Sequence, residues 1–591
     1  MTACGLDRTL TRLTQRLLDA RQRKSHWSGE LSDSALSTAT AVIALYLADS
    51  NDPLVAAGLA WLERTQNPDG GFGDTVQSLS NLSTTALCWA AFSITGRKGA
   101  AEDRSVGWIH RAAGGLESKV LVNALAARYG GDRTFSVPIL TVLAAAGIVP
   151  WRLVPQLPFE MAACPRSWFA RLGLPVVSYA LPALIAIGQT RHRRQPSRNP
   201  AARLVRDMAS GRTLRVLERI QPANGGYLEA TPLTSFVCIS LLAAGLEAGS
   251  VLTRGLGFLR RSARPCGSWP IDTNLATWIT TLSVNALRNH LPEADREPIA
   301  AWLLGQQYCS VHPYTGTAPG GWSWTDLPGG VPDADDTAGA LVALHTLGLR
   351  GPKIIASATS GVRWLLDLQN RDGGIPTFCR GWGKLPFDRS SADITAHALL
   401  AWSAWRSALG PADRSRVDVA ISRALAFLVG AQRPDGAWAP LWFGNQFARR
   451  EENPVYGTAR VLLGMRHIQP ESLAAPRAVR WLLTAQNEDG GWGGDQDSPS
   501  SIEETSLAVS ALAGLPGASE REAARQGAAW IAQTTCDGEK TPPSPIGLYF
   551  ARLWYYESSY PLIFALDALR RVTDHVEQTA GAHGGEHNAR A

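Results

Sequence analysis

The sequence predicts an all-α fold in which pairs of helices stack side by side. A short unit recurs along the chain: an apolar helical stretch, a Gln, a tight turn, and then Gly with an aromatic or apolar residue. Apolar residues at helical spacing precede and follow the copies, and runs with strand periodicity are almost absent. Such helix pairs bury their apolar faces only against their neighbours, so the repeats predict a solenoid or a closed α/α barrel. The copies read QNPDGGFG from Gln66, QPANGGY from Gln221, QNRDGGI from Gln369, QRPDGAW from Gln432 and QNEDGGWGG from Gln486.

Degraded copies extend the pattern. One begins at Gln306, one without its Gln ends at Trp269, and QTTCDG at Gln533 is a third. The Asp-Gly and Gly-Gly turns end one helix, and the Ser, Thr or Asp residues beyond them can cap the next. The Trp at the end of a turn offers a large face for packing against the Gln amide or the next helix. Most of the 21 Trp residues are therefore expected to brace the repeats.

Composition narrows the class of protein. The 591 residues are 45 % apolar and 18 % charged, which suits a globular chain of two domains. The net charge of +6 comes from scattered Arg residues without interleaved aromatics, so nucleic acid is not an expected partner. The eight cysteines form no C-x-x-C pair and are interpreted as reduced core residues of a cytoplasmic protein. They are Cys4, Cys88, Cys164, Cys238, Cys266, Cys309, Cys379 and Cys536.

Two apolar stretches bear on membrane contact, one from Val137 to Trp151 and one from Leu174 to Gly188. Each contains Pro and falls short of the roughly 18 apolar residues that a spanning helix needs. They are either two buried core helices or a patch that dips into a bilayer without crossing it. The N-terminal residues lack the basic and apolar regions of a secretory signal.

Three carboxylates crowd into four positions of the run GVPDADDTAGALVALHTLG. They are Asp333, Asp335 and Asp336, and no Lys or Arg lies beside them in the run. A calcium loop of the EF-hand type needs Gly at its sixth and Glu at its twelfth position, where this chain has Ala338 and Leu344. The D-D-x-x-D spacing of a magnesium–diphosphate site is absent as well. A helix N-cap accounts for one Asp but not for three.

An acid explains the cluster better. Like-charged carboxylates a few ångströms apart cannot all ionise, so one is expected to hold its proton near neutral pH. Burial raises its pKa further, while a helix N-terminus lowers it. Protonating a carbon–carbon double bond also requires that hydrogen bonds or a cation stabilise the anion left behind. His397, in DITAHAL, is a candidate for that task, although a lone His on an apolar helix is more often a satisfied core residue.

Together these features resemble the squalene–hopene and oxidosqualene cyclases. The Gln-to-Trp repeats are of that family's kind, and PDADDTA matches its D-x-D-D-T-A motif. Further blocks follow in the family's order up to about Val572, before a His- and Gly-rich tail. They are WPIDTNLATWITTLSVNAL from Trp269, PFDRSSADITAHAL from Pro386, VYGTARVL from Val455 and SIEETSLAVSAL from Ser501.

The resemblance implies two α/α barrels with a cavity between them. The N-terminal domain is expected over residues 20–258, with its stretch 137–188 facing a membrane and the cavity opening beside it. The C-terminal domain, carrying the aspartates, is expected over 259–572, either alone or joined by residues 1–19. The remaining residues, 573–591, are expected to be disordered.

The resemblance also implies the roles of the acid group. Asp335 is the proton donor, Asp333 and Asp336 hold and recharge it, and His397 raises its acidity. The carbocations that follow need aromatic faces and an apolar, water-free cavity. The residues expected to contact the substrate are Ile271, Trp322, Trp324, Phe378, Trp442, Gln446, Tyr456, Tyr549 and Tyr556.

Several of these positions depart from the family. Ile271 stands where the family has a Trp before Asp-Thr, Gln446 replaces the second Trp of W-F-G-x-W, and Phe378 stands where Tyr is usual. Trp322 or Trp324 must replace the aromatic residue of a Gln-Phe-Asp-Asn-type segment. We therefore expect an intact acid group in an altered cavity, in which Gln446 is a candidate to hold a water that turns the last cation into an alcohol.

The implied activity is that of a class II, protonation-initiated terpene cyclase without cofactor or metal. It would convert squalene or a related linear polyprene to a polycyclic, hopene- or hopanol-like triterpene. The alternatives are a cyclase of another C20–C35 isoprenoid and a non-catalytic prenyl- or lipid-binding barrel. A zinc-dependent protein prenyltransferase would need an Asp, Cys and His set that the sequence does not present, and no basic cluster favours a diphosphate. Peripheral, monotopic binding to the cytoplasmic face of the cell membrane is implied, and a homodimer is left open.

Overall fold

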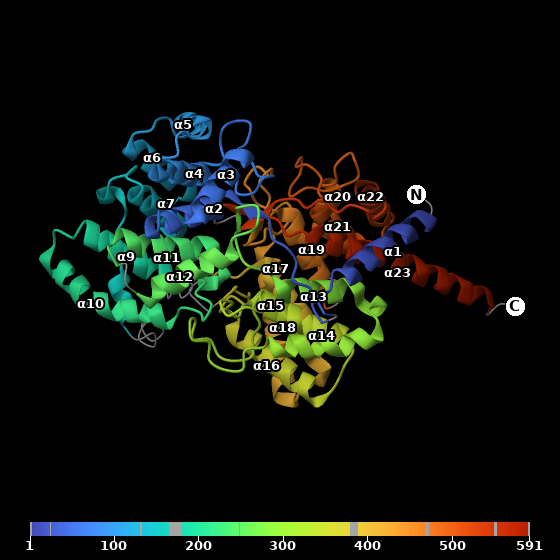
Figure 1. Cartoon of the computed structure of the whole chain (residues 1–591). Coiled ribbons are helices and arrows are strands. Elements are labelled where there is room, and N and C mark those ends of the chain that lie inside the picture. Colours follow the sequence, from blue (N-terminus) through green and yellow to red (C-terminus); the bar gives the residue numbers. More distant parts are fainter. Residues whose placement is uncertain are drawn as a thin grey trace.

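The computed structural model describes residues 3–23, 25–130, 133–164, 180–246, 249–378, 388–466, 468, 472–548 and 552–588. Their helices form two bodies that lie side by side, one from each half of the chain (Figure 1). Each body consists of an inner ring of helices surrounded by outer ones. The all-α prediction of two α/α barrels is confirmed.

The N-terminal barrel closes through five inner helices, each in contact with the next, with the last in contact with the first. The inner helices are α2 (Ala35–Ala48), α4 (Leu82–Thr95), α7 (Arg133–Ala145), α9 (Leu181–Arg194) and α11 (Thr231–Ala243). The outer helices are α3 (Pro53–Thr65), α5 (Ala100–Ala113), α6 (Ser118–Tyr129), α10 (Pro200–Arg219) and α12 (Ser250–Ser262). Short 3-10 turns at Trp151–Leu153 and Phe159–Ala163 follow α7.

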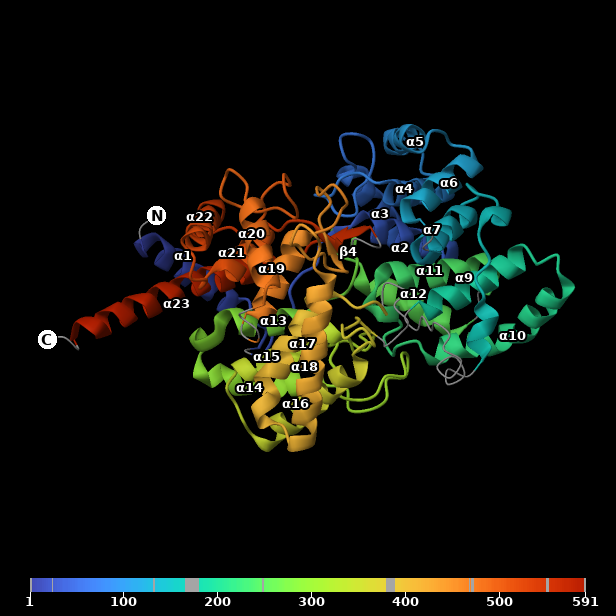
Figure 2. The same cartoon turned by 180° about the vertical axis from the view of Figure 1, so that it is seen from behind.

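The C-terminal barrel closes through six inner helices in the same way. They are α13 (Ala276–Leu287), α15 (Ala334–Thr346), α17 (Ala392–Trp405), α19 (Pro454–Met465), α21 (Ile502–Leu512) and α23 (Tyr560–Asn588). Its outer helices are α14 (Glu293–Gly305), α16 (Pro352–Leu368), α18 (Pro411–Ala431), α20 (Ala474–Thr484), α22 (Ala518–Thr534) and α1 (Ala3–Asp19). Helix α1 packs against α22 and α23, so the first helix of the chain completes the outer layer of the second barrel (Figure 2).

Short strands connect distant segments between the barrels. Strand β1 (Asp33–Ser34) pairs antiparallel with β2 (Trp269–Pro270), and Ser34 lies opposite Trp269. Strands β3 (Phe443–Gly444), β4 (Ile546–Leu548) and β5 (Leu553–Tyr555) form an antiparallel sheet in that order. These pairs fix loops from both halves of the chain beside the junction of the barrels.

The repeated Gln and Gly have a common structural role. In each of the five clear copies, the Gln Nε2 donates to the carbonyl of the Gly four residues later and to a carbonyl of the next outer helix. For Gln369 these acceptors are Gly373 at 2.8 Å and Ala420 at 3.0 Å. The Gly itself has a positive φ, 92° at Gly373, which lets the turn close without a Cβ. The degraded copy uses Gln307, which bonds Gly320 and Ser357, rather than Gln306.

The Trp that closes a turn is also a brace, as predicted. Trp438 and Trp492 are fully buried, and each donates its indole N–H to a carbonyl ten residues earlier. Trp322 also donates its indole N–H to a helix carbonyl, that of Leu303, at 2.8 Å and 19 residues earlier. These bonds satisfy helix C-terminal carbonyls that would otherwise lack a partner in the core.

Two expectations need correction, and one of the two alternatives for the 137–188 stretch is favoured. The chain is helical through Asn588, so residues 573–588 are not a disordered tail: α23 continues outward from a well-packed segment, where Asp574 approaches Arg288. Cys164, Cys266, Cys309 and Cys536 are exposed rather than in the core. Residues 136–144 of α7 are buried, as are most of the first ten residues of α9, so the described parts of the 137–188 stretch are mainly core helices.

Candidate active site between the barrels

The three aspartates lie at the N-terminus of α15. Asp333 is its N-cap, and its Oδ1 accepts the backbone N–H of Asp336 at 2.9 Å. A backbone bridge between Asp333 and Trp322 holds the approach to the helix, because Asp333 N–H donates to the Trp322 carbonyl at 3.0 Å. The cap was one of the alternatives for the cluster, and Asp333 indeed fills it. Asp335 and Asp336 remain for other tasks.

Asp335 contacts His397, as the sequence predicted. His397 lies on the neighbouring inner helix α17, and its Nδ1 is 2.5 Å from Asp335 Oδ1. Beyond it, on α19, the guanidinium of Arg460 lies with Nη2 3.4 Å from the same Nδ1. Trp278 of α13 presents an edge-to-face contact to the imidazole at 6.1 Å. Four inner helices thus meet at this imidazole.

Charge and burial set the three carboxyls apart. Burial raises the pKa of Asp333, and it raises that of Asp336 well above the usual range, where the negative charge of Asp333 adds to it. Burial alone would also raise the pKa of Asp335, but His397 and Arg460 together lower it. Burial lowers the pKa of His397, which favours the neutral imidazole whose Nδ1–H donates to Asp335. The surroundings therefore favour protonated Asp333 and Asp336 beside a stronger acid at Asp335.

A cavity of about 370 Å³ lies against Asp333, Asp335 and Asp336 and extends between the barrels. Both halves of the chain line it. The N-terminal half contributes Tyr129, Phe135 and Phe236, among others, and the C-terminal half contributes the rest from loops, strands and the first turns of inner helices. The Asp335 side chain is 17 % exposed because it faces this cavity. An acid of this kind can deliver a proton to an apolar molecule held there.

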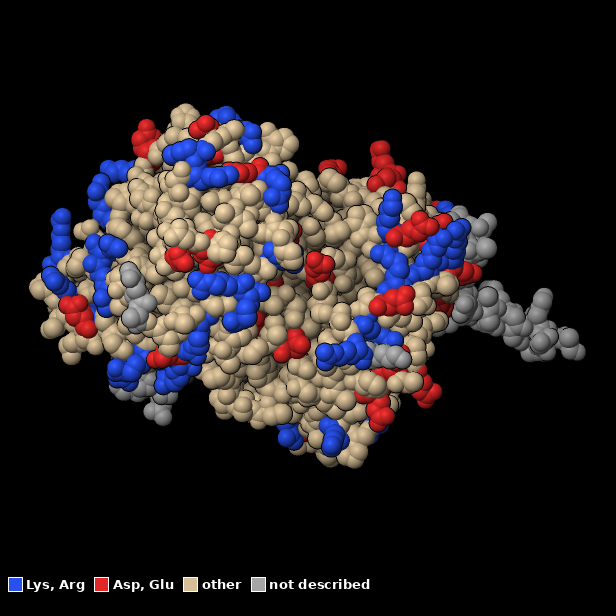
Figure 3. Space-filling model, viewed as in Figure 1, with Lys and Arg blue, Asp and Glu red and all other residues tan. Residues whose placement is uncertain are grey.

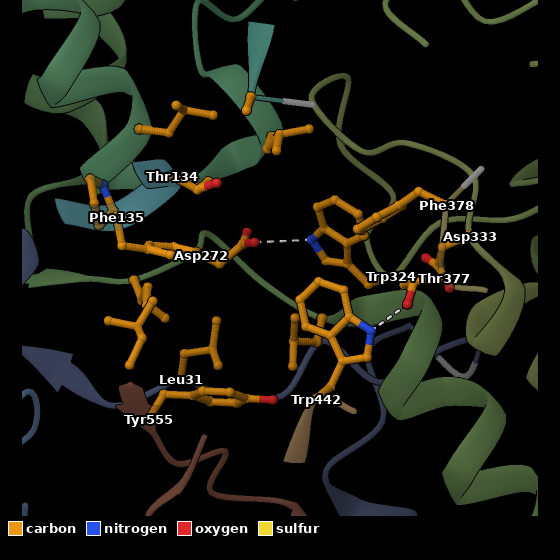
Figure 4. Close-up of a pocket in the computed structure, with 18 of the residues that line it drawn as sticks. Leu31, Thr134, Phe135, Asp272, Trp324, Asp333, Thr377, Phe378, Trp442 and Tyr555 are labelled. Atoms are coloured by element: carbon orange, nitrogen blue, oxygen red, sulfur yellow. Dashed lines mark hydrogen bonds between the residues drawn. The ribbon is translucent and has the colours of Figure 1, made fainter. Parts of the chain in front are cut away.

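Aromatic edges and faces line the cavity near the aspartates. Trp324, Phe378 and Trp442 form a series in which neighbouring rings meet nearly at right angles, at 6.4 Å and 5.7 Å (Figure 4). The Trp442 indole N–H bonds Thr377 Oγ1, which fixes its face toward the cavity. Ile271, predicted at a position that usually carries Trp, lines the cavity too. These four positions lie where the sequence placed them.

Four other predicted substrate contacts are not among the lining residues. Trp322 is a repeat brace. Gln446 Oε1 accepts the backbone N–H of Leu79 at 2.9 Å, so this side chain links the two barrels. Tyr456 packs against Phe443 behind the wall, with ring centroids 4.6 Å apart and ring planes tilted by 42°. Tyr556 comes directly after Tyr555, the last residue of β5, and successive side chains of a strand point to opposite faces. Tyr549 lies outside the described residues.

The sequence reading missed five residues of the site. Trp278, Tyr555, Tyr560 and Asp272 line the cavity, and Arg460 lies behind His397. The sequence held a signal for two of them. Arg460 is the single charged residue in the apolar run VYGTARVLLGM, and Trp278 lies within the block WPIDTNLATWITTLSVNAL that resembles the family. Tyr555 required the register of β5 against β4.

Two general features concern the described part of the chain. It contains no group of three or more His, Cys, Asp or Glu side chains arranged to hold a metal ion. Within the same ranges, every helix is too short or too polar to cross a bilayer.

Comparison with known proteins gives the family. Residues 10–224 match the squalene-hopene cyclase N-terminal domain, and residues 274–574 match the squalene-hopene cyclase C-terminal domain. Two α/α barrels around an acid-bearing cavity define a class II terpene cyclase. The chain belongs to the squalene–hopene cyclase family.

Individual relatives are distant. Enfumafungin synthase of Hormonema carpetanum is 28 % identical over 570 residues, covering 80 % of this chain but 41 % of the relative's length. The squalene–hopene cyclase of Zymomonas mobilis is 24 % identical over 626 residues, covering 89 % of this chain and 88 % of its own. Among solved structures, ent-copalyl diphosphate synthase from Streptomyces platensis is 20 % identical, with a TM-score of 0.59, and covers 97 % of this chain and 100 % of its own. That likeness concerns the fold.

Proposed function

We propose that this chain protonates a linear polyprene and cyclises it, with squalene the first substrate to consider. The observation that carries the proposal is the Asp335–His397 contact of 2.5 Å at a carboxyl that faces the cavity. The Asp335 O–H bond breaks as its proton adds to a terminal C=C, and the resulting tertiary cation is attacked by the next C=C along the chain. Loss of a proton, or addition of water, ends the sequence.

The neighbours of Asp335 have separate tasks in this scheme. His397 and Arg460 stabilise the carboxylate at the moment of transfer. Asp336 and Asp333, which hold protons more tightly, return one to Asp335 after each cycle. Trp278, Trp324, Phe378 and Trp442 offer ring faces and edges to the developing cations, each worth roughly 0.5–2 kcal/mol.

The charges along the cavity favour a neutral substrate. Its lining contains four carboxyl side chains and one guanidinium, that of Arg552. Arg552 already pairs with Glu451 at 3.0 Å, so little positive charge is left for a diphosphate. We therefore place a hydrocarbon or weakly polar polyprene ahead of a prenyl diphosphate.

The test is turnover by detergent-solubilised protein, with extracts analysed by gas chromatography–mass spectrometry beside Asp335→Asn. A cyclic C30 product from squalene that disappears in the variant supports the proposal. Turnover of a C20–C35 polyprene but not of squalene would retain the cyclase and change its substrate. Binding of polyprenes without any turnover, unaffected by Asp335→Asn, would favour a non-catalytic binding barrel.

We also propose that α10 meets an anionic membrane surface, from which such a substrate would be drawn. Leu204, Val205 and Met208 share one face of α10 and are 61 %, 53 % and 76 % exposed. Exposed Arg residues flank them at positions 203, 212, 215 and 219. Lys and Arg side chains surround this end of the molecule (Figure 3). An apolar face with basic flanks suits a helix that lies in the membrane interface.

Vesicle flotation tests this surface. The protein should float with vesicles that contain phosphatidylglycerol and less with pure phosphatidylcholine. Replacement of Leu204 and Met208 by Ser should abolish flotation while turnover of detergent-solubilised substrate persists. Equal flotation of the variant would exclude α10 as the contact.

A further inference from the structure

A fourth carboxyl, apart from the acid cluster, lies in the wall of the cavity. Asp272 follows β2, and its backbone is held by a bridge to Ala230 and by the Thr231 N–H, which donates to the Ile271 carbonyl at 3.1 Å. Its side chain points into the cavity between Phe135 and the indole of Trp324 (Figure 4). A rigid backbone thus places a polar group in an otherwise apolar stretch of wall.

The hydrogen bonds of Asp272 use its oxygens as acceptors and leave the O–H donor of its protonated form unused. Its Oδ2 accepts the Trp324 indole N–H at 3.0 Å, and its Oδ1 accepts the backbone N–H of Thr273 at 2.7 Å. Both are donors to the carboxyl. Among the side chains and backbone of the described ranges, no acceptor is recorded for a proton on Asp272 itself.

The environment of Asp272 favours its neutral form. Burial raises the pKa of Asp272 well above its usual range, and the charge of nearby Glu229 adds to the effect. Glu229 is itself held by N–H and N–H₂ donors from Gly329 and Asn224, at 2.6 Å and 2.7 Å. A neutral carboxyl also suits a cavity through which carbocations pass, since a carboxylate there would capture them as esters.

We infer that Asp272 donates a hydrogen bond to an oxygen atom held inside the cavity. The inference rests on the proposed cyclase function and narrows its chemistry. The oxygen belongs either to the substrate, as a hydroxyl or carbonyl on a polyprene, or to a water that ends the cyclisation. In the second case a water lone pair forms a C–O bond with the last cation, and the oxonium releases its extra proton to solvent. This is the role that the sequence had suggested for Gln446.

The first experiment compares substrates of one length with and without an oxygen. Geranylgeraniol and its deoxy hydrocarbon are given to the wild type, Asp272→Leu and Asp272→Asn, and kcat/KM is measured for each pair. Leu removes the donor at similar volume, while Asn keeps one acceptor and supplies N–H donors. If the substrate carries the oxygen, Asp272→Leu should lower kcat/KM for the alcohol about 10-fold or more relative to that for the hydrocarbon, with Asn intermediate.

The second experiment uses squalene in H₂¹⁸O. If water is the occupant, the wild type should form a labelled cyclic alcohol, and Asp272→Leu should shift the product to the alkene. The inference is overturned if Asp272→Leu changes neither the alcohol preference nor the alcohol-to-alkene ratio. Asp335→Asn runs in parallel: wild-type turnover that this variant abolishes upholds the cyclase even where Asp272 proves irrelevant. Thermal unfolding of both Asp272 variants confirms that they are folded.

Discussion

Replacing Arg460 by Met should weaken the acid without removing any group that touches the substrate. The Arg460 guanidinium lies 3.4 Å from His397 Nδ1, which lies 2.5 Å from Asp335 Oδ1, so the charges are no more than about 5.9 Å apart. At an effective dielectric constant of about 20, this attraction is worth about 2.8 kcal/mol, or roughly 2 pKa units. The pKa of Asp335 should rise accordingly in the variant.

The direction of the effect on activity follows from the sign of that shift. Only protonated Asp335 can react, so activity is lost as pH rises through its pKa. In Arg460→Met this alkaline limb should move upward by as much as about 2 pH units, while the plateau of kcat falls by up to about 100-fold because the acid is weaker. Asp393, Tyr456 and Asp567 also act on Arg460 and remain in place in the variant.

The assay is a pH profile of kcat for polyprene cyclisation by each protein. Arg460→Lys, which keeps the charge, should recover most of the wild-type profile. Arg466→Met serves as the control, because Arg466 is a largely buried Arg at the end of the same helix that bonds the carbonyl of Ala513. An alkaline limb that stays at its wild-type pH in Arg460→Met, with only a lower plateau, would refute the electrostatic argument and assign Arg460 to packing.

Three further predictions follow from described contacts. Replacing His397 by Phe should lower kcat by about 100-fold or more with little change in KM, because Asp335 loses its hydrogen-bond partner. A rise in KM as large as the fall in kcat would indicate instead that the substitution had displaced the cavity wall. Asp567, whose pKa is lowered by Arg571 and Arg288 against the effect of burial, should contribute stability above the pKa of its unfolded form and lose it as pH falls. Asp567→Asn should thus cost about 2 kcal/mol in urea unfolding at pH 7 and progressively less toward pH 3, and a constant difference would contradict this. Gly436→Ala should lower the free energy of unfolding by at least about 1 kcal/mol, since Gly436 has a φ of 103° and a Cβ would meet the Arg477 carbonyl at 2.6 Å. Gly410→Ala, in open space at a helix N-cap, should lower it by only about a few tenths of a kcal/mol. Equal melting temperatures of the two variants would exclude backbone strain as the cause.

The parts of the site that depend on local sequence were predictable. The Asp run, the cap at Asp333 and the position of His397 on an inner helix all follow from motifs with short spacing. Trp442 and Phe378 also lie where their blocks indicated. The repeats predicted the barrel architecture, because the Gln-to-Gly bond and the positive φ of the Gly are local properties.

The orientation of individual cavity residues was not predictable in the same way. Tyr555 and Tyr556 are neighbours in sequence, and the register of β5 alone decides that the first faces the cavity. Gln446 accepts a hydrogen bond from Leu79 of the other barrel, and no local sequence pattern predicts a contact between residues 367 positions apart. Arg460 and Asp272 act through side chains from other elements, so their significance emerged only once α17, α19 and the loop after β2 were placed together.

The position of α1 has a consequence for how the chain is assembled during synthesis. Helix α1 is synthesised before the N-terminal barrel, whereas its partners α22 and α23 are synthesised after that barrel. Arg16 bonds the carbonyl of Gly538, and Arg570 reaches back to Thr14, so this closure joins the two extremes of the sequence. Contacts of such long sequence separation form late. The first barrel can therefore fold co-translationally, while the outer layer of the second stays incomplete until α22 and α23 can pack against α1.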